Sequence, residues 1–585
     1  MPLDFRNTNS IWASILVETC HRLGLTTAVI CPGSRSTPLT VAFATHPHIE
    51  TLPILDERSA AFFALGMAKK TAKPVAIVCT SGTAGANFYP AIIEARESRV
   101  PLLILTADRP PELRHCHSGQ TIDQIKLYGN YPNWHAELAT PSLEISMLRY
   151  LRQTVIHAWE KTLFPIPGAV HLNLPFRDPL PPLPQPEAQA LGSELNESEF
   201  FVNCRPLRYH ASAFIPEIPL QEWQSCHRGI ILGGVAQPPD PKGYCDAIAH
   251  LSQTLQFPVL AEGLSPLRNY SDRNPYLIST YDILLRNPLL AHTLAPQIVI
   301  QIGDLPTSKQ LRAWLDSIQP IYYLIDPTYH NLDPLHGKTI HLRTSIEQLA
   351  AKNWQQTHGK TSASKPHNYL KLWCDAESNC RQKLDKLIAS NPAIFEPKIP
   401  WMLSQLLPKK TPIFIANSMP VRDVEFFWKP GNRAIRPFFN RGANGIDGTL
   451  STALGIAHHN QPSVMLTGDL ALLHDTNGFL LRNKFKGHLT LVLINNNGGG
   501  IFEMLPISQF EPPFEEFFAT PQHINFAELC LTYGVEHQLI SSWENLEEAL
   551  NPLPKTGIRV LELKTHRHRD AQWRKDCFQK LADRL

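Results

Sequence analysis

The stretch LTGDLALLHDTNGFLLRNKFKGHLTLVLINNNGGGIF, residues 466–502, decides how the whole sequence is interpreted. Residues 463–467 form a short apolar run that predicts a buried strand, and residues 474–485 have the spacing of a helix. Residues 489–494 predict a second buried strand, which ends in the letters NNNGGG. Strand, helix and strand in this order predict two parallel strands whose carboxyl ends lie at one edge of a sheet.

Two polar side chains follow these strands directly. Asp469 and Asn496, 27 positions apart, would meet at that edge, next to a free backbone carbonyl in the glycine turn. Carboxylate, amide and carbonyl oxygens are ligands for a hard cation such as Mg²⁺, and consecutive glycines let the backbone approach a ligand closely. The alternative is an ordinary strand–helix–strand unit in which Asp469 caps a helix and an Asn-Gly pair makes a turn. Local chemistry alone leaves both interpretations open.

Length and composition limit the class of protein. A chain of 585 residues predicts three or four domains, and a formal net charge of +2 argues against nucleic-acid or membrane partners. The 11 cysteines form no CxxC pair, which fits a reducing cytoplasm. The longest apolar runs are far shorter than the ~20 residues of a membrane helix, and the start of the chain lacks the pattern of a signal peptide. We therefore expect a cytoplasmic protein with no membrane span and no nucleic-acid partner.

A polar turn follows the first predicted strand. Residues 10–23 predict a helix and residues 26–31 a strand, and the turn PGSRSTP then leads into another helix. Ser34 and Arg35 in this turn suit an anion at a helix N-terminus. The alternative is a capped turn with a solvated arginine.

A carboxylate stands at the next junction of strand and helix. Residues 52–55 predict a strand and residues 59–70 a helix, with Glu57 between them. Such junctions often carry active-site groups, although a helix-start carboxylate favoured by the helix dipole has the same appearance. Further strands over residues 75–79 and 101–106 complete a doubly wound α/β pattern.

Two linkers are expected. The proline-rich run LPFRDPLPPLPQP at 174–186 predicts the first, and residues 360–366 predict the second. A second α/β set begins near residue 229 and a third near residue 400. We expect three doubly wound parallel-sheet domains over 1–185, 200–360 and 375–585.

The spacing of GD and NN resembles the thiamine-diphosphate-binding motif of thiamine-dependent enzymes, with Leu470 in place of the usual second glycine. Together with Glu57 and three α/β domains it resembles the decarboxylase-like architecture, in which a pyrimidine-binding, a middle and a diphosphate-binding domain follow in order. Four stretches are similar to the SEPHCHC synthase family, and these are CPGSRSTP (31–38), TADRPPEL (106–113), NRGANGID (440–447) and IFEMLP (501–506).

The resemblance implies a cofactor and a metal. Glu57 would be catalytic, because in these enzymes it holds N1′ of the aminopyrimidine, and Ile446 would bend the cofactor. The metal, Mg²⁺ with Mn²⁺ as a possible substitute, would bind Asp469, Asn496 and the carbonyl of Gly498. The implied cofactor-binding residues are Glu57, Ser418, Ile446, Asp469, Leu470, Asn496 and Gly498.

The resemblance also implies the reaction. The family decarboxylates 2-oxoglutarate and adds the resulting succinyl carbanion equivalent 1,4 to isochorismate, in menaquinone or phylloquinone biosynthesis. Its members act as homodimers or homotetramers with active sites at the subunit interface. Both substrates carry carboxylates, which arginine binds well. The implied substrate-binding residues are Ser34, Arg35, Gln120, Lys309, Ser418, Arg422, Arg441, Phe502 and Leu505.

One departure and two alternatives remain. Gln310 follows Lys309 where some family members have a second cation, a charge that Arg312 could replace. Another thiamine enzyme, such as an acetohydroxyacid synthase or a 2-oxoacid decarboxylase, would share Glu57, Asp469 and Asn496. A non-catalytic protein that binds the cofactor is the second alternative.

Overall fold

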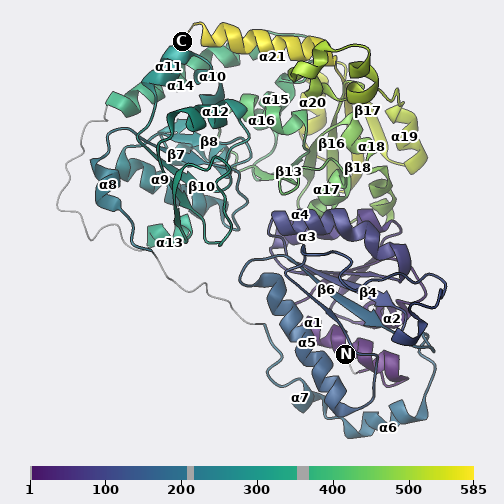
Figure 1. Cartoon of the computed structure of the whole chain (residues 1–585). Helices are drawn as coiled ribbons and strands as arrows, with labels where there is room; N and C mark the ends of the chain where they lie inside the picture. The colour runs from purple at the N-terminus through teal and green to yellow at the C-terminus, as the bar shows by residue number, and fades with distance from the viewer. Residues whose placement is uncertain (1–2, 207–215, 352–367, 585) are drawn as a thin grey trace. The chain divides into compact units, whose positions relative to one another are not determined.

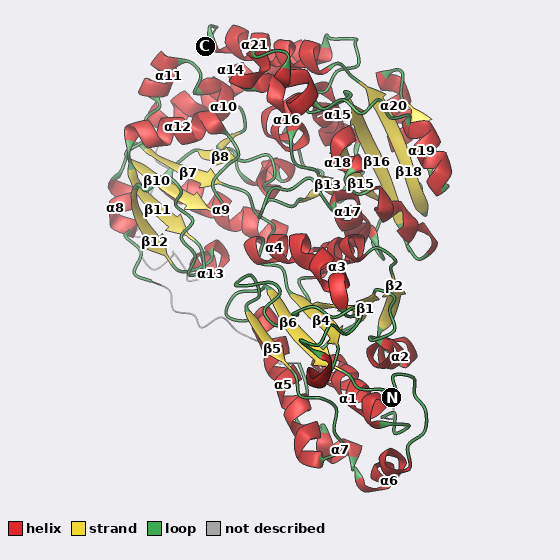
Figure 2. Cartoon of the chain, turned by 45° about the vertical axis from the view of Figure 1, so that its right-hand side comes forward, coloured by secondary structure: helices red, strands yellow, loops and turns green. Residues whose placement is uncertain are grey.

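The computed structural model describes residues 3–206, 216–351 and 368–584 and contains three six-stranded parallel sheets (Figures 1 and 2). This confirms the predicted α/β class. The chain divides into two compact units. The first unit is Met1–His210, Asn440–Asn460 and Ala471–His488, and the second unit is Ala211–Phe439, Gln461–Leu470 and Leu489–Leu585. The predicted linker at 360–366 lies outside the described residues.

The first sheet has the strand order β2-β1-β3-β4-β6-β5. Its central strands are buried along their whole length, as expected of a parallel sheet covered on both faces. Its strands are β1 (Thr27–Ile30), β2 (Glu50–Pro53), β3 (Val75–Cys79), β4 (Leu102–Asp108), β5 (Trp134–Glu137) and β6 (Ala169–Pro175). Its helices are α1 (Thr8–Leu23), α2 (Thr37–Thr45), α3 (Glu57–Thr71), α4 (Tyr89–Glu97), α5 (Ile145–Leu163), α6 (Pro186–Glu194) and α7 (Glu197–Phe200).

Two expectations for this part were wrong in detail. The strand expected at 52–55 begins at Glu50 and ends at Pro53, because β2 pairs with β1 from Thr27 onward. The run expected as a linker from residue 174 begins inside β6, where Leu174 is 1% exposed in the core.

Two later segments of the chain also belong to the first unit. Helix α17 (Thr449–Ala457) packs against α3, and the 3-10 helix η6 (Thr476–Asn483) packs against α17. The backbones of α3 and α17 are so close that a Cβ atom at Gly66 would lie 2.1 Å from the carbonyl oxygen of Thr452. A Cβ atom at Gly455 would lie 2.0 Å from the carbonyl oxygen of Phe63. Only glycine fits at these two positions.

The second unit holds the other two sheets. The middle sheet has the order β12-β11-β10-β7-β8-β9. Its strands are β7 (Gly229–Gly233), β8 (Val259–Ala261), β9 (Leu277–Ile278), β10 (Ile298–Ile302), β11 (Ile321–Ile325) and β12 (Lys338–Leu342). Its helices are α8 (Leu220–Ser225), α9 (Pro241–Leu255), α10 (Tyr281–Leu284), α11 (Pro288–Thr293), α12 (Lys309–Ile318) and α13 (Ile346–Ala351).

The third sheet has the order β14-β13-β15-β16-β18-β17. Its strands are β13 (Pro412–Ile415), β14 (Arg436–Phe438), β15 (Ser463–Gly468), β16 (His488–Asn495), β17 (Glu536–Leu539) and β18 (Gly557–Lys564). The remaining α-helices of the second unit are α14 (Asn368–Ala389), α15 (Lys398–Leu406), α16 (Met419–Phe427), α19 (Phe526–Tyr533), α20 (Trp543–Leu550) and α21 (Arg567–Ala582), and α18 (Asp469–Leu473) begins in the second unit and ends in the first.

The helix expected over 474–485 was wrong in its type and its bounds. The structure has the short helix α18 and then the 3-10 helix η6. Between them Asp475 is fully buried, and its carboxylate accepts hydrogen bonds from the backbone N–H of Ser451 at 2.7 Å and from the hydroxyl of Ser59 at 3.2 Å. These bonds hold the chain at residue 475 and interrupt the helix. None of the described helices is both long and apolar enough to cross a membrane.

Candidate active site

The third sheet changes direction between β13 and β15. Strand β14 lies on one side of β13 and β15 on the other, so a crevice forms at the carboxyl ends of β13 and β15, where open α/β sheets bind ligands. The register pairs Gly468 at the end of β15 with Ile494 near the end of β16. Asp469 and Asn496 therefore follow neighbouring strand ends, as the sequence predicted.

Asp469 is held by backbone donors. One carboxylate oxygen accepts from the N–H of Leu470 at 2.9 Å and the other from the N–H of Gly498 at 2.8 Å. Burial raises the pKa of Asp469 to about 6, and the charge of Glu396 adds to the rise. The two backbone hydrogen bonds lower the pKa but do not outweigh burial. A cation beside this carboxylate would relieve the cost of its burial.

Asn496 offers an unused oxygen. Its Nδ2 donates to Glu396 Oε1 at 2.6 Å, whereas its Oδ1 is buried and has no hydrogen-bond partner among the described residues. Buried polar atoms rarely stay unpaired, so this oxygen indicates a ligand.

The glycine turn completes an oxygen-rich site. Gly498 has φ +144°, and a Cβ atom there would lie 2.4 Å from the carbonyl oxygen of Ala519, so only glycine fits. The carbonyl of Gly498 accepts from the N–H of Gly500 at 2.9 Å and keeps a second lone pair. The carboxylate of Asp469, the free amide oxygen of Asn496 and this carbonyl suit Mg²⁺.

Ser418 and Arg422 lie at the carboxyl end of β13. Ser418 precedes α16 with φ +72°, a backbone conformation that concentrates at functional sites. Arg422, one turn into α16, donates to the carbonyl of Ser418 at 2.6 Å. Phe502 and Leu505 are half-buried in and just after the 3-10 helix η7 (Gly500–Met504), directly after the glycine turn.

Lys309 is exposed at the first residue of α12, which Ser308 caps. The side chain of Gln310 donates to the carbonyl of Leu285 at 3.0 Å. The Nε of Arg312 donates to the carbonyl of Pro306 at 2.9 Å, so part of its guanidinium is already hydrogen-bonded to the loop before α12. Replacement of the missing cation by Arg312 stays a prediction.

In the first unit, Glu57 is the first residue of α3. Asp56 before it caps the helix by accepting from the N–H of Ser59 at 3.1 Å. The carboxylate of Glu57 itself makes no hydrogen bond to another described residue. Burial raises the pKa of the Cys31 and Cys79 thiols, and the charge of Glu57 adds to both shifts. Glu57 thus lies beside the carboxyl ends of β1 and β3, where the first sheet changes direction.

Arg35 is 8% exposed in the turn after β1. Its Nη1 donates to the carbonyl of Phe176 at 3.0 Å, and its buried Nε has no partner among the described residues. Burial lowers the pKa of Arg35, and the charge of Arg109 lowers it further. Ser34 beside it is exposed.

Our sequence reasoning missed Arg109. Arg109 directly follows strand β4, and Arg35 lies in the turn after strand β1. An arginine just after a predicted buried strand was the pattern in the sequence that could have identified Arg109. The guanidinium of Arg109 donates to Ser81 Oγ at 2.8 Å and to the carbonyl of Gly119 at 3.0 Å. Two cationic side chains at this edge of the sheet suit a substrate with carboxylates.

Gln120 lines a cavity of about 730 Å³ in the first unit. Its Nε2 donates to the carbonyl of Ser81 at 2.9 Å, and its φ is +56°. His115 and His117 line the same cavity with φ of +56° and +58°. Arg441 and Ile446 are half-buried in another loop of this unit, where Glu94 accepts from the N–H of Gly442 at 3.1 Å.

The structure therefore distributes the predicted residues over both units. Ser34, Arg35, Glu57, Gln120, Arg441 and Ile446 are in the first unit, and Lys309, Ser418, Arg422, Asp469, Leu470, Asn496, Gly498, Phe502 and Leu505 are in the second.

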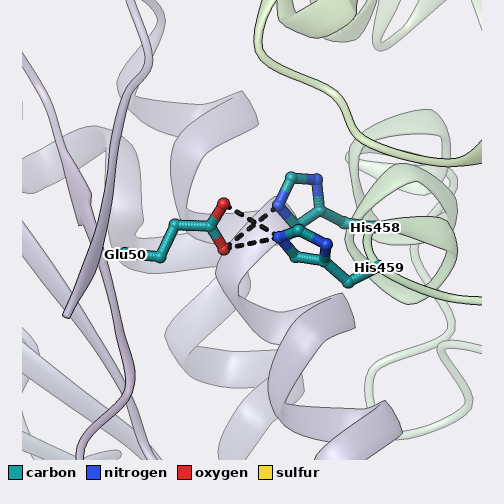
Figure 3. Close-up of side chains that lie close together, drawn as sticks. All are labelled: Glu50, His458 and His459. Carbon is teal, nitrogen blue, oxygen red and sulfur yellow. Dashed lines mark hydrogen bonds and ion pairs between the residues drawn. The ribbon is translucent and has the colours of Figure 1, made fainter. Parts of the chain in front are cut away.

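A separate cluster joins β2 to the end of α17 (Figure 3). The carboxylate of Glu50 lies 3.4 Å from Nε2 of His458 and 2.9 Å from Nε2 of His459, and Lys486 Nζ lies 2.7 Å from it. His458 Nδ1 accepts from the backbone N–H of Lys486 at 3.2 Å, so the ring proton is on Nε2 and points to Glu50. That proton and the Lys486 charge oppose a cation. The cluster, which we call the Glu50 clasp (Glu50, His458, His459 and Lys486), is an ion-pair network.

Comparison with known proteins defines the class. Residues 12–127 match "Thiamine pyrophosphate enzyme, N-terminal TPP binding domain", residues 190–415 match "Middle domain of thiamine pyrophosphate", and residues 427–562 match "Thiamine pyrophosphate enzyme, C-terminal TPP binding domain". Benzoylformate decarboxylase from Polynucleobacter necessarius has a similar fold, with a TM-score of 0.67 at 16% identity over 95% of this chain and 98% of that chain. The fold and these matches define a thiamine-diphosphate-dependent enzyme.

Similar relatives narrow the class to one family. The 2-succinyl-5-enolpyruvyl-6-hydroxy-3-cyclohexene-1-carboxylate synthase of Trichodesmium erythraeum (strain IMS101) is 66% identical over 100% of both chains. The synthase of the same name from Gloeothece citriformis (strain PCC 7424) is 63% identical over 100% of both chains. The chain belongs to the family of these synthases, abbreviated SEPHCHC synthases.

Proposed function

We propose that this protein is a thiamine-diphosphate-dependent transferase that decarboxylates 2-oxoglutarate and adds the succinyl group 1,4 to isochorismate. The product is 2-succinyl-5-enolpyruvyl-6-hydroxy-3-cyclohexene-1-carboxylate, a precursor in menaquinone or phylloquinone biosynthesis. The observation that carries the proposal is the full-length identity of 66% to a synthase of this name. The unpaired buried Oδ1 of Asn496 beside Asp469 supports an intact cofactor site.

Asp469, Asn496 and the carbonyl of Gly498 would hold Mg²⁺, or Mn²⁺ in its place, and through the metal the diphosphate. When bound, thiamine diphosphate would supply a cationic thiazolium ring that takes up the electrons released on decarboxylation. Glu57 would hold a proton at N1′ of the aminopyrimidine, for which its carboxylate is available. Ile446 would bend the cofactor, and Ser418 and Leu470 would contact it.

The remaining residues would bind carboxylates and exclude water. Arg35 has an unpaired buried Nε, and a bound carboxylate would satisfy it. Phe502 and Leu505 would form an apolar wall, which strengthens charge interactions by lowering the local dielectric. The other proposed contacts are Ser34, Gln120, Lys309, Ser418, Arg422 and Arg441.

We further propose a cytoplasmic homo-oligomer, a dimer or a tetramer, with domains over 1–185, 200–360 and 375–585. Glu57 and Asp469 would serve one cofactor from two different subunits.

Product analysis tests the function. The protein is incubated with thiamine diphosphate, Mg²⁺ and 2-oxoglutarate, with and without isochorismate. The expected result is the cyclohexene product only when isochorismate is present, with one CO₂ released per product. Products from pyruvate or another 2-oxoacid with no use of isochorismate would indicate a different thiamine enzyme, and no CO₂ release from any 2-oxoacid would indicate a non-catalytic protein.

A further inference from the structure

The side-chain amide of Asn496 is held in one orientation. Its Nδ2 donates to Glu396 Oε1 at 2.6 Å, and its Oδ1 is the atom left for a metal. An amide has nearly the same shape after a half-turn about its last bond, so sterics alone do not select the oxygen. The reversed amide would present N–H hydrogens, which repel a cation. The partner of Nδ2 therefore decides whether Asn496 can bind a metal.

Glu396 is kept an acceptor by a buried arginine. Its Oε2 accepts from Arg574 Nη2 at 2.5 Å, and Arg574 also forms a double contact with Asp423, at 2.8 Å and 2.5 Å. Glu396, Asp423 and Arg574 are all fully buried. Burial works against the charge of Arg574, but the charges of Asp423 and Glu396 outweigh burial and raise its pKa, so the guanidinium stays cationic.

The backbone of Glu396 is fixed as well. Its N–H donates to Asp570 Oδ2 at 3.0 Å, and Asp570 lies on α21 one turn before Arg574. The amide of Asn496 is thus tied through Glu396 to helix α21. Glu396 lies just before α15 and belongs to no recognisable sequence motif, so local sequence does not mark it as part of the site.

We propose that Glu396, fixed by Arg574, is a positioning residue that forces Asn496 to present its oxygen to the metal. The inference rests on the metal site proposed above. Partners of this kind, which hydrogen-bond a metal ligand without touching the metal, commonly set its orientation.

The substitution Glu396→Gln reverses the direction of the contact at nearly constant shape. Arg574 is a donor, so it selects the carbonyl oxygen of the new glutamine, and the glutamine NH₂ then faces Asn496. Asn496 satisfies this donor by turning its Oδ1 toward residue 396 and its Nδ2 toward the metal. We expect the affinity for Mg²⁺ to fall by roughly 10- to 100-fold, the usual range for loss of such a partner.

The double variant Glu396→Gln/Asn496→Asp exchanges carboxylate and amide and conserves the net charge. The new aspartate accepts from the glutamine NH₂ with one oxygen and offers the other to the metal. We expect its Mg²⁺ affinity to exceed that of Glu396→Gln by at least about tenfold, a coupling that a double-mutant cycle isolates. Asn496→Asp alone places two buried carboxylates in contact and is expected to bind Mg²⁺ more weakly than the double variant.

The readout is equilibrium binding without substrate. Mg²⁺ is titrated into the full-length apo protein at fixed thiamine diphosphate, and binding is followed by calorimetry. Glu562→Gln is the matched control, because buried Glu562 accepts from the neighbouring Asn495 Nδ2 at 2.7 Å in the same way. The control is expected to bind Mg²⁺ within about twofold of the wild type, since Asn495 Oδ1 already accepts from the N–H of Asn497.

The outcomes are distinct. Glu396→Gln with wild-type Mg²⁺ affinity overturns the proposal, and so does a folded double variant that binds no better than Glu396→Gln. If Glu396→Gln does not fold, the double variant decides alone, because it must then bind Mg²⁺ within about tenfold of the wild type. Asp469→Ala separates this inference from the site itself. Unchanged Mg²⁺ binding in that variant means that the metal site is elsewhere, whatever Glu396 does.

Discussion

At the scale of single residues, the proposed chemistry depends on groups that the protein leaves unsatisfied. Asn496 Oδ1 and Arg35 Nε are buried without a partner among the described residues. Burial of such an atom without a partner costs free energy, and a hydrogen bond or metal contact from a ligand offsets that cost. Arg574 differs from them in that its Nε and Nη2 both donate to Asp423.

Glu57→Gln tests the proposed role of Glu57 in holding a proton at N1′ of the cofactor. The substitution keeps the shape of the side chain but removes the ability to exchange a proton. We expect turnover to fall by roughly 10²-fold or more, the scale of general acid–base contributions, while thiamine diphosphate still binds. Steady-state rates at saturating cofactor, with cofactor affinity measured separately, provide the check. A near-normal rate would show that Glu57 has another role.

Glu50→Gln tests the electrostatics of the Glu50 clasp. Burial opposes the charge of Glu50, but hydrogen bonds from Lys486 and His459 outweigh it and lower the pKa from 4.5 to about 2. A carboxylate with a depressed pKa adds stability above its unfolded value and loses it as the pH falls through its folded value. We expect the variant to be less stable than the wild type at neutral pH, and the difference to shrink between pH 4.5 and about 2.

Urea unfolding over this pH range measures the difference. Glu547→Gln, an exposed position on α20, serves as the control and is expected to track the wild type. A difference in free energy of unfolding that does not change with pH would mean that Glu50 contributes through packing instead of charge.

At the scale of elements, the contact between α3 and α17 orders the first unit. Glu57 is the first residue of α3, and α17 follows the loop that carries Arg441 and Ile446. The two helices approach closely enough for a backbone oxygen of each to lie against a glycine of the other. This close approach fixes α3, and with it the position of Glu57 at the strand edge.

Gly66→Ala tests that approach. The new Cβ atom would lie 2.1 Å from the carbonyl oxygen of Thr452, which is backbone and cannot rotate away. We expect a loss of roughly 1–3 kcal/mol in the free energy of unfolding, as for overpacking in a close-packed core. Gly431→Ala is the matched control, because nothing lies within 4 Å of its new Cβ atom. Equal stability of the two variants in urea unfolding would show that the helices are free to separate.

At the scale of the whole molecule, the proposed site residues are distributed over three parallel sheets of six strands each. The first sheet has Glu57 and Arg35 at its carboxyl edge, the third has Asp469 and Asn496, and the middle sheet has Lys309 on the helix after β10. In each of the first and third sheets, the strand order reverses next to the proposed site residues.

Complementation between inactive chains tests the proposed shared site. Glu57→Gln and Asp469→Ala chains, each inactive alone, are mixed under conditions that allow subunit exchange. If the two residues serve one cofactor from different subunits, a mixed dimer has one site with both wild-type residues. Random reassortment makes about half of the dimers mixed, so up to roughly a quarter of wild-type activity is expected to return. Exchange confirmed by mass spectrometry without any return of activity would contradict the shared site.

The local patterns of the sequence by themselves determined the α/β class and the strand ends that carry Asp469, Asn496, Arg35 and Glu57. Buried parallel strands are continuous apolar runs, and their ends are marked by polar and glycine residues, so both are visible in the chain order. The same reasoning predicted one helix over 474–485 where the chain forms the short 3-10 helix η6, because Asp475 bonds to Ser451 and Ser59, which are not its neighbours in the sequence.

Only the tertiary structure decided which amide oxygen is free and what holds it. Glu396 lies 100 positions before Asn496, and Arg574 lies 178 positions after Glu396, so no local pattern connects them. The contact of α17 with α3 and the Glu50 clasp depend in the same way on segments brought together by folding. Hydrogen-bond direction and close backbone approach are properties of three-dimensional neighbours, and residue spacing does not encode them.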